Sequence, residues 1–428
     1  MKLLLKGGRI IDPSQNIDAE MDLLIENGKI AKMGRNLSDS ENNSTTVKTL
    51  DLRNTLIVPG LIDMHTHLRE PGHEYKETIQ TGSEAAVAGG FTSIACMPNT
   101  NPINDNRSVT DFILKQAGIC NMANVYPIAA ISKMSEGKIL SEFGDLKDAG
   151  AVAFSDDGNP VTNSRLMRSA LEYAHPLNMT VISHCEVLDL STGGTMNEGF
   201  VSTELGLQGI PNIAESIMVE RDIALADYTN TSVHIAHVSA AESVRAIRAA
   251  KARGVHVTAE TAPHYFTLTD EALREFSTNA KVYPPLRNMK DVESIKEGLK
   301  DGTIDVIASD HAPHSSIEKD VEFEYAAKGI NGLETSLSLS LKLVDDDILT
   351  FHQLIEKMST NPARILKINK GTLTIGSDAD LTIIDTQKSW TVNVNIFRSK
   401  SKNSPFHGWK LKGKAIMTIV GGEIKYQV

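Results

Sequence analysis

The chain has 428 residues and a formal net charge of −11, and 41% of its residues are hydrophobic. This length allows a large core and about two domains, and the composition is that of a soluble globular protein. The excess of negative charge argues against a nucleic acid or an anionic membrane surface as a partner.

Short β-strands are predicted at both ends of the chain. Near the N-terminus they are "KLLLKGGRII", "MDLLIENGKIAKMG" and "VKTLDLRNTLIVPG", interrupted by the polar connector "SDSENNSTT". Near the C-terminus they are "GTLTIGSDADLTIID", "WTVNV" and "KLKGKAIMTIVGGEIKYQV". Gly, Asn and Asp mark the turns in both regions. The shared texture predicts one small β-sandwich domain made of residues 1–57 and 368–428.

Residues 58–367 alternate between strand-like and helix-like segments. The first of these segments overlaps the end of the last N-terminal strand run. Eight strand-like runs follow one another: "LIVPGLIDMH", "FTSIACMP", "VYPIAAIS", "AVAFSDD", "NMTVISHC", "SVHIAHVS", "GVHVTAET" and "DVIASDH". Eight βα units predict an α/β fold of the (β/α)₈ TIM-barrel type. A doubly wound open sheet is the alternative, because strand count alone does not establish closure.

Two of the intervening helices have clear sequence signals. "IAESIMVERDIALADY" is apolar at helical spacing, and "SAAESVRAIRAAKARG" is the second helix-like segment. In the second segment, Ser239 and Glu242 have the spacing of a capping box, and Gly254 is the expected stop.

Polar residues follow the predicted strands where a barrel places its active site, at the carboxyl ends. His65, His67 and Arg69 come first, and their two-residue spacing directs them to one side of an extended strand. The later strand ends carry Asn99, Asp156, Asp157, His184, His237, Glu260, His264, Asp310, His311 and His314. Their convergence in one barrel mouth predicts a metal site.

Four histidines and two aspartates suit two divalent ions that share a carboxylate. Imidazole and carboxylate ligands favour zinc, with manganese or cobalt as alternatives. Two such ions can activate a shared hydroxide and polarise a carbonyl, so the pattern indicates hydrolysis at a carbonyl or phosphoryl centre.

Longer motifs resemble a known family. The H-x-H, the later single histidines and the final aspartate are similar to the amidohydrolase superfamily. "HTHLREPG", "MPNT", "FSDDG", "GIPNIAES", "TAETAPHYF", "PPLR", "SDHAPH", "GLET" and "DADLTIID" together resemble its dihydroorotase family, of the longer bacterial (class I) type. The match runs over nearly the whole chain.

The resemblance implies a role for each site residue. His65, His67 and Asp310 would hold one metal ion, and His184 and His237 would hold the second. Asp157 would bridge the ions, in place of the carboxylated lysine of many relatives, and Asp310 would also be the general base. Asp156 would be a supporting or loop-capping residue. The substrate contacts would be His67, Arg69, Asn99, Tyr283, His314, Lys328 and Gly329, with Arg69, Asn99 and His314 on the substrate carboxylate.

Two of these positions depart from the family pattern. Tyr283 stands where the family usually has asparagine before "PPLR", and Ala327-Lys328-Gly329 stands where it usually has Pro-Phe-Gly. Both places contribute to the substrate pocket in relatives. Because the carboxylate-binding residues are retained, we interpret both changes as drift compensated nearby.

The implied function is the reversible hydrolysis of (S)-dihydroorotate to N-carbamoyl-L-aspartate in de novo pyrimidine (UMP) biosynthesis, by a binuclear metal-bound hydroxide. A hydantoinase-like or allantoinase-like cyclic amidase is one alternative, but its uncharged ring would give Arg69 no partner. A non-catalytic partner of aspartate transcarbamoylase is another, although such proteins typically lose metal ligands and all six are present here. The sequence is also compatible with a homodimer.

The expected compartment is the cytoplasm. Cys96, Cys120 and Cys185 show no close paired spacing, which favours a reducing environment. The apolar run at the N-terminus is too short for a signal peptide, and no stretch approaches the roughly 20 apolar residues of a membrane span.

Overall fold

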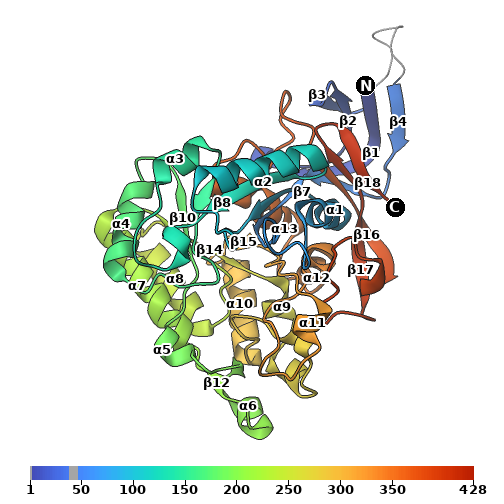
Figure 1. The fold of residues 1–428 in the computed structure, drawn as a ribbon. Helices are drawn as coiled ribbons and strands as arrows, with labels where there is room; N and C mark the ends of the chain where they lie inside the picture. The colour runs from blue at the N-terminus through green and yellow to red at the C-terminus, as the bar shows by residue number, and fades with distance from the viewer. Residues whose placement is uncertain (1, 38–46) are drawn as a thin grey trace.

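A barrel of eight parallel strands forms the centre of the computed structural model, which describes residues 2–37 and 47–428 (Figure 1). Its strands are neighbours in chain order: β6 (Leu61–Thr66), β7 (Phe91–Cys96), β8 (Asn124–Ala129), β9 (Ala153–Phe154), β10 (Thr180–Ser183), β13 (Val233–Ile235), β14 (Val257–Thr261) and β15 (Val306–Ile307). A parallel bridge between Thr66 and His311 connects the first strand to the segment after the last. The predicted barrel is therefore confirmed, and the open sheet is excluded.

Helices cover the outside of the barrel. The longer ones are α1 (Ile79–Gly89), α2 (Arg107–Cys120), α4 (Ser164–Ala174), α7 (Ile213–Thr229), α8 (Ala241–Ala252), α10 (Met289–Asp301) and α12 (Leu333–Asp345). Shorter ones are α3 (Phe143–Asp148), α5 (Leu188–Ser191), α6 (Phe200–Leu205), α9 (Pro263–Thr267), α11 (Ser316–Lys319), α13 (Phe351–Ile355) and α14 (Asn361–Leu366). Within the described ranges, no helix is long and apolar enough to cross a membrane.

Apolar side chains fill the barrel interior. One buried cluster joins residues from several barrel strands, and only the interior can bring such side chains together. Its members include Met64, Ala95, Ile128, Ala153, Ile182 and Val306. A larger cluster lies between the strands and the surrounding helices. Burying one Ile or Met side chain contributes about 1.5–3 kcal/mol. Because both clusters contain many such side chains, they hold the barrel strands, and with them the polar residues at the strand ends, in place.

The predicted capping box of α8 is wrong. The helix begins after Ala240, and no side chain of its own first turn caps it. Glu215 of α7 accepts hydrogen bonds from the backbone N–H groups of Ser239 and Ala240, both at 3.1 Å, and the Ser239 hydroxyl also donates to it. Buried carboxylates on neighbouring helices supply the cap, since Asp291 accepts from Ala241 N at 2.9 Å. Gly254 does follow the helix, at φ +84°.

Both chain ends build a second sheet beside the barrel (Figure 1). Its strands are β1 (Lys2–Asp12), β2 (Ile17–Glu26), β3 (Lys29–Gly34), β4 (Val47–Asp51), β5 (Leu56–Pro59), β16 (Leu381–Thr391), β17 (Lys410–Val420) and β18 (Glu423–Gln427). The C-terminal β16 pairs antiparallel with β5, which leads through Gly60 into barrel strand β6. A two-stranded sheet, β11 (Met196–Asn197) with β12 (Gly209–Ile210), lies apart.

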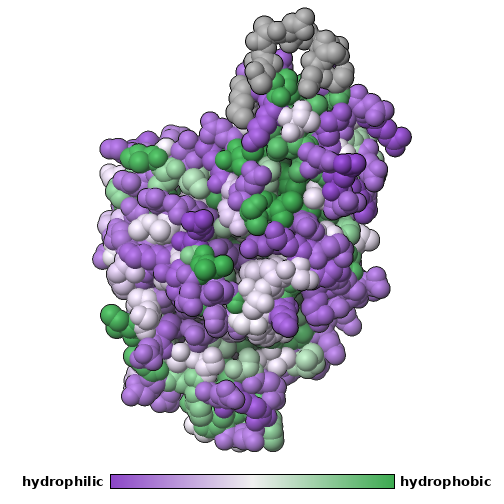
Figure 2. Space-filling view, turned by 90° about the vertical axis from the view of Figure 1, so that its right-hand side faces the viewer, coloured by the Kyte–Doolittle hydropathy of each residue, from purple (hydrophilic) through white to green (hydrophobic). Residues whose placement is uncertain are grey.

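The terminal sheet packs through one apolar cluster that includes Leu5, Ile57, Leu381 and Ile383, all fully buried. Figure 2 shows the side of the molecule on which this sheet lies. The surface there is largely hydrophilic, with a hydrophobic area extending from the sheet toward the barrel. The predicted connector at residues 38–46 lies outside the described residues.

Candidate metal centre

Six side chains from the carboxyl ends of five barrel strands converge in one buried cluster. His65 lies in β6 and His67 just after it, and the others follow β9, β10, β13 and β15: Asp157, His184, His237 and Asp310. All six are buried. The barrel alone brings them together, because they are spread over 245 positions between His65 and Asp310 (310 − 65).

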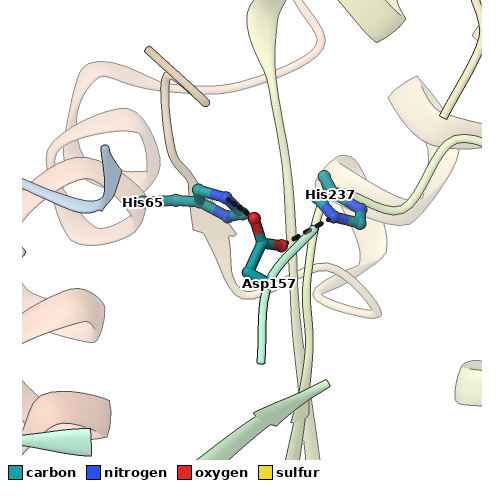
Figure 3. A group of neighbouring side chains, drawn as sticks. All are labelled: His65, Asp157 and His237. Carbon is teal, nitrogen blue, oxygen red and sulfur yellow. Dashed lines mark hydrogen bonds and ion pairs between the residues drawn. The ribbon is translucent and has the colours of Figure 1, made fainter. Parts of the chain in front are cut away.

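Asp157 lies between His65 and His237 (Figure 3) and is within 3.6 Å of all four histidines of the cluster. Its Oδ2 is 3.4 Å from His65 Nε2 and 3.6 Å from His67 Nε2. Its Oδ1 is 3.2 Å from His237 Nε2 and 3.4 Å from His184 Nδ1. Each oxygen thus faces a different pair of imidazoles, which is the arrangement that a carboxylate shared by two cations requires.

Asp310 completes the side of the cluster that His65 and His67 form. Its Oδ1 is 3.3 Å from His67 Nε2 and 3.5 Å from His65 Nε2. His65, His67 and Asp310 could hold one cation, and His65, Asp157 and His237 form a second group within ligand distance. His65 Nε2 is buried without a hydrogen-bond partner, so a cation would satisfy an atom that is otherwise costly to bury. The donor set therefore fits divalent metal ions.

Three of the four histidines have a partner on the ring nitrogen that faces away from the cluster. His65 Nδ1 is 2.5 Å from Glu260 Oε1, and His67 Nδ1 is 2.9 Å from Asn99 Oδ1. His184 Nε2 is 3.1 Å from Glu186 Oε2. An N–H donated outward leaves the inner nitrogen with its lone pair free, which is the tautomer that a metal ligand needs. Asn99 thus contacts a histidine directly, in addition to lining the cavity.

Glu260 and Glu186 were not predicted in this role. The only available signal for Glu186 was its position two residues after His184, and sequence could not show which way its carboxylate points. Burial acts to raise the pKa of Glu260, but His65 and His234 outweigh burial and lower that pKa to about 2. Glu260 is therefore a buried carboxylate placed directly behind His65.

A cavity of about 430 Å³ opens over the cluster. Beyond the cluster residues it is lined by the predicted substrate contacts Arg69, Asn99, Tyr283, His314, Lys328 and Gly329. Glu186, Ser191 and Gly193 also line it, from the segment that follows β10. All predicted substrate contacts, including His67, thus face one space.

Arg69 is a buried cation in this cavity wall. Its Nε donates to Pro313 O at 3.2 Å, and its Nη2 lies 3.3 Å from His314 Nε2. Burial lowers the pKa of Arg69 to about 10, so the guanidinium stays protonated at neutral pH. Among residues 2–37 and 47–428, no carboxylate forms an ion pair with it, which leaves its charge available to an anionic ligand.

His314 and the remaining polar residues are held by the protein itself. Burial, then the charge of Arg69, lower the pKa of His314 to about 2, and its Nε2 donates to Lys328 O at 2.9 Å. Asp156 accepts from Ser132 N at 3.0 Å and points to a neighbouring loop. His311 Nε2 lies 3.2 Å from Glu77.

Similarity to known proteins extends over the whole chain. Residues 56–425 match the model of the amidohydrolase family. The chain is 62% identical over 427 residues to a dihydroorotase of Syntrophus aciditrophicus and 57% identical over 427 residues to one of Geobacter metallireducens, with 100% of each chain covered. An L-hydantoinase (dihydropyrimidinase) from Arthrobacter aurescens has a similar structure, with TM-score 0.88 and 26% identity over 99% of this chain and 96% of that one. A dihydropyrimidinase from Brevibacillus agri shares the fold with TM-score 0.84 and 24% identity, over 100% and 95%.

Proposed function

The chain belongs to the amidohydrolase family and, within it, to the dihydroorotases, and from this premise we propose how its site acts. The reaction is the reversible hydrolysis of the cyclic amide of dihydroorotate to N-carbamoyl-aspartate, a step of pyrimidine synthesis. One observation carries the assignment of substrate to this cavity: Arg69 is a buried cation without a carboxylate partner among the described residues, in the same wall as the six-residue cluster.

Two divalent ions, with zinc favoured, are the cofactors we propose. His65, His67 and Asp310 would hold one ion, His184 and His237 the other, and Asp157 would bridge them. When bound, the ions supply a nucleophile at neutral pH and polarise the carbonyl that is attacked. The placement of the two Asp157 oxygens against different imidazole pairs supports this division.

Other residues that line the same cavity would orient the substrate. We assign its carboxylate to Arg69, with Asn99 and His314 beside it, and the ring to a space bounded by His67, Tyr283, Lys328 and Gly329. A guanidinium presents two parallel N–H groups to a carboxylate, so it fixes the orientation of the ring as well as its position.

Asp310 is the proposed proton carrier. Its carboxylate lines the cavity and touches His67 and His65 through one oxygen only. It would accept the proton of the attacking water as the C–O bond forms. It would return that proton to the ring nitrogen as the C–N bond breaks, which leaves a ureido group and a carboxylic acid that releases the second water proton to solvent at neutral pH.

Two other functions fit the site less well. A hydantoinase-like activity has a structural neighbour in its favour, and an allantoinase-like activity is a related alternative. In both cases an uncharged ring would leave the Arg69 charge buried without a carboxylate partner. A metal-free scaffold for aspartate transcarbamoylase would not need all six cluster residues. We propose a cytoplasmic enzyme, since its three cysteines are free thiols. A homodimer and a complex with aspartate transcarbamoylase are both compatible with this proposal.

Initial rates with dihydroorotate, hydantoin and allantoin test this function on the purified, zinc-loaded chain. We expect kcat/KM for dihydroorotate to exceed the other two by a factor on the order of 10² or more. Equal or faster hydrolysis of hydantoin or allantoin would contradict the assignment.

A further inference from the structure

Three segments of the chain meet at one buried carboxylate, Glu186. It follows β10 and accepts hydrogen bonds at Oε1 from the Tyr283 hydroxyl and the Ser191 hydroxyl. Its other oxygen, Oε2, lies 3.1 Å from His184 Nε2. Ser191 belongs to α5 and Tyr283 to the segment before α10, so the contact joins two loops of the cavity wall to His184.

Tyr283 itself is held from a second side. The Lys328 ammonium lies 3.5 Å from the centre of its ring, a cation–π distance, and the ring is nearly parallel to that of His184, at 14° and 6.3 Å. Tyr283 and Lys328 are the two places where the sequence departs from the family pattern, and in space they touch. The two departures therefore form one unit.

We propose that Glu186 is a positioning residue for His184 and that Tyr283, braced by Lys328, holds Glu186 in place together with Ser191. The inference rests on the proposed metal centre. With Nε2–H donated to Glu186, the His184 imidazole presents Nδ1 to Asp157 Oδ1 and His237 Nε2, which lie 3.4 and 2.8 Å away. Both hydroxyls meet Oε1 and leave Oε2 for the histidine, so removal of the tyrosine hydroxyl should loosen the carboxylate without unfolding the loop.

Metal affinity is the direct readout, because it does not require substrate. Partners of this kind typically change metal affinity by about 10–100-fold. A chromophoric chelator competes with the metal-free chain for Zn²⁺, and its absorbance reports how tightly the chain binds. We expect E186Q to bind one of the two ions, the one assigned to His184 and His237, at least 10-fold more weakly than the native chain. We expect Y283F, which keeps the ring and the Lys328 contact, to weaken the same ion by a smaller factor.

A double-mutant cycle separates positioning from a general effect on the loops. If Tyr283 acts through Glu186, then Y283F should have no further effect on affinity when added to E186Q. Glu275 and Tyr325 are exposed, and E275Q and Y325F are the matched controls that should bind both ions as the native chain does. In turnover, E186Q should lower kcat with little change in KM for dihydroorotate.

Native affinity for both ions in E186Q and in Y283F would overturn the proposal, as would additive effects in the double variant. If E186Q does not fold, Y283F and the Ser191→Ala change decide the matter by the same measurement. An affinity loss in a chain that does not hydrolyse dihydroorotate would leave this proposal standing and reject the proposed function.

Discussion

Arg69 should supply the positive charge that recognises the carboxylate of the substrate. Arg69→Met keeps much of the side-chain volume and removes the charge, so metal content should be unchanged while kcat/KM for dihydroorotate falls. We expect a loss on the order of 10²-fold, or about 3 kcal/mol, as for a buried charge pair. Dihydrouracil, which lacks the carboxylate, serves as the matched substrate. It should be a poor substrate of both proteins, and its rate should change little.

Loss of metal or of folding in the Arg69→Met chain would instead show that Arg69 has a structural role.

Arg69 has a backbone φ of +63°, a conformation that costs a non-glycine residue on the order of 1–3 kcal/mol. His237 and Asp310 also have positive φ, at +33° and +47°. Three of the site residues are thus held in strained backbone, which indicates that the surrounding barrel fixes their direction.

Asp310 should be needed for turnover more than for metal binding. In Asp310→Asn the amide oxygen can still act as a weak ligand, but the group cannot accept a proton at neutral pH. We expect kcat for dihydroorotate to fall by a factor on the order of 10² or more, with more than half of the bound metal retained by elemental analysis. A variant with near-native kcat would require a different base.

At the scale of elements, the segment between β16 and β17 holds the two loops that carry His314 and Gly329. Asn403 is buried there, and its Nδ2 donates to Ala312 O and Gly329 O, both at 3.0 Å. Its Oδ1 accepts from His314 N at 3.1 Å. Asn403→Ala would leave these buried groups unpaired, at a cost of about 1–3 kcal/mol each, so we expect a lower midpoint of thermal unfolding and a higher KM for dihydroorotate.

Asn395→Ala is the control, because Asn395 is exposed in the same segment. Native KM and native unfolding in both variants would show that Asn403 does not hold the loops. No sequence signal pointed to Asn403: it lies far along the chain from the motifs and is brought to them only by the terminal sheet.

Gly329 should tolerate no side chain. Its φ is +138°, and a Cβ there would lie 2.6 Å from Ala312 Cβ and 3.3 Å from His314 Cδ2. Gly329→Ala should therefore displace the loop and raise KM for dihydroorotate by a factor on the order of 10, or about 1–2 kcal/mol. Gly118→Ala, at an exposed helical position with open space around it, is the matched change and should leave KM unaltered. Equal KM values in the two variants would contradict this reading of the loop.

At the scale of the whole molecule, alternation of strand-like and helix-like segments predicted eight βα units, because local periodicity indicates which face of each element is buried. Closure into a barrel did not follow from the alternation and is established by the parallel bridge between Thr66 and His311. The strand ends then identified the polar cluster around His65 and Asp157. Contacts that depend on packing between distant elements could not be predicted, since no local pattern encodes them. Glu215 capping α8, Glu260 behind His65 and the Tyr283–Lys328 pair are of this kind.

The central claim is that dihydroorotate hydrolysis depends on two metal ions in this barrel mouth, and titration of Zn²⁺ into metal-free chain while following dihydroorotate turnover tests it most directly. Chelator-treated protein should be inactive. The rate of turnover should rise with added Zn²⁺ and stop rising at two equivalents per chain, because the six-residue cluster holds two ions. Full turnover in protein shown by elemental analysis to contain no metal would contradict the claim.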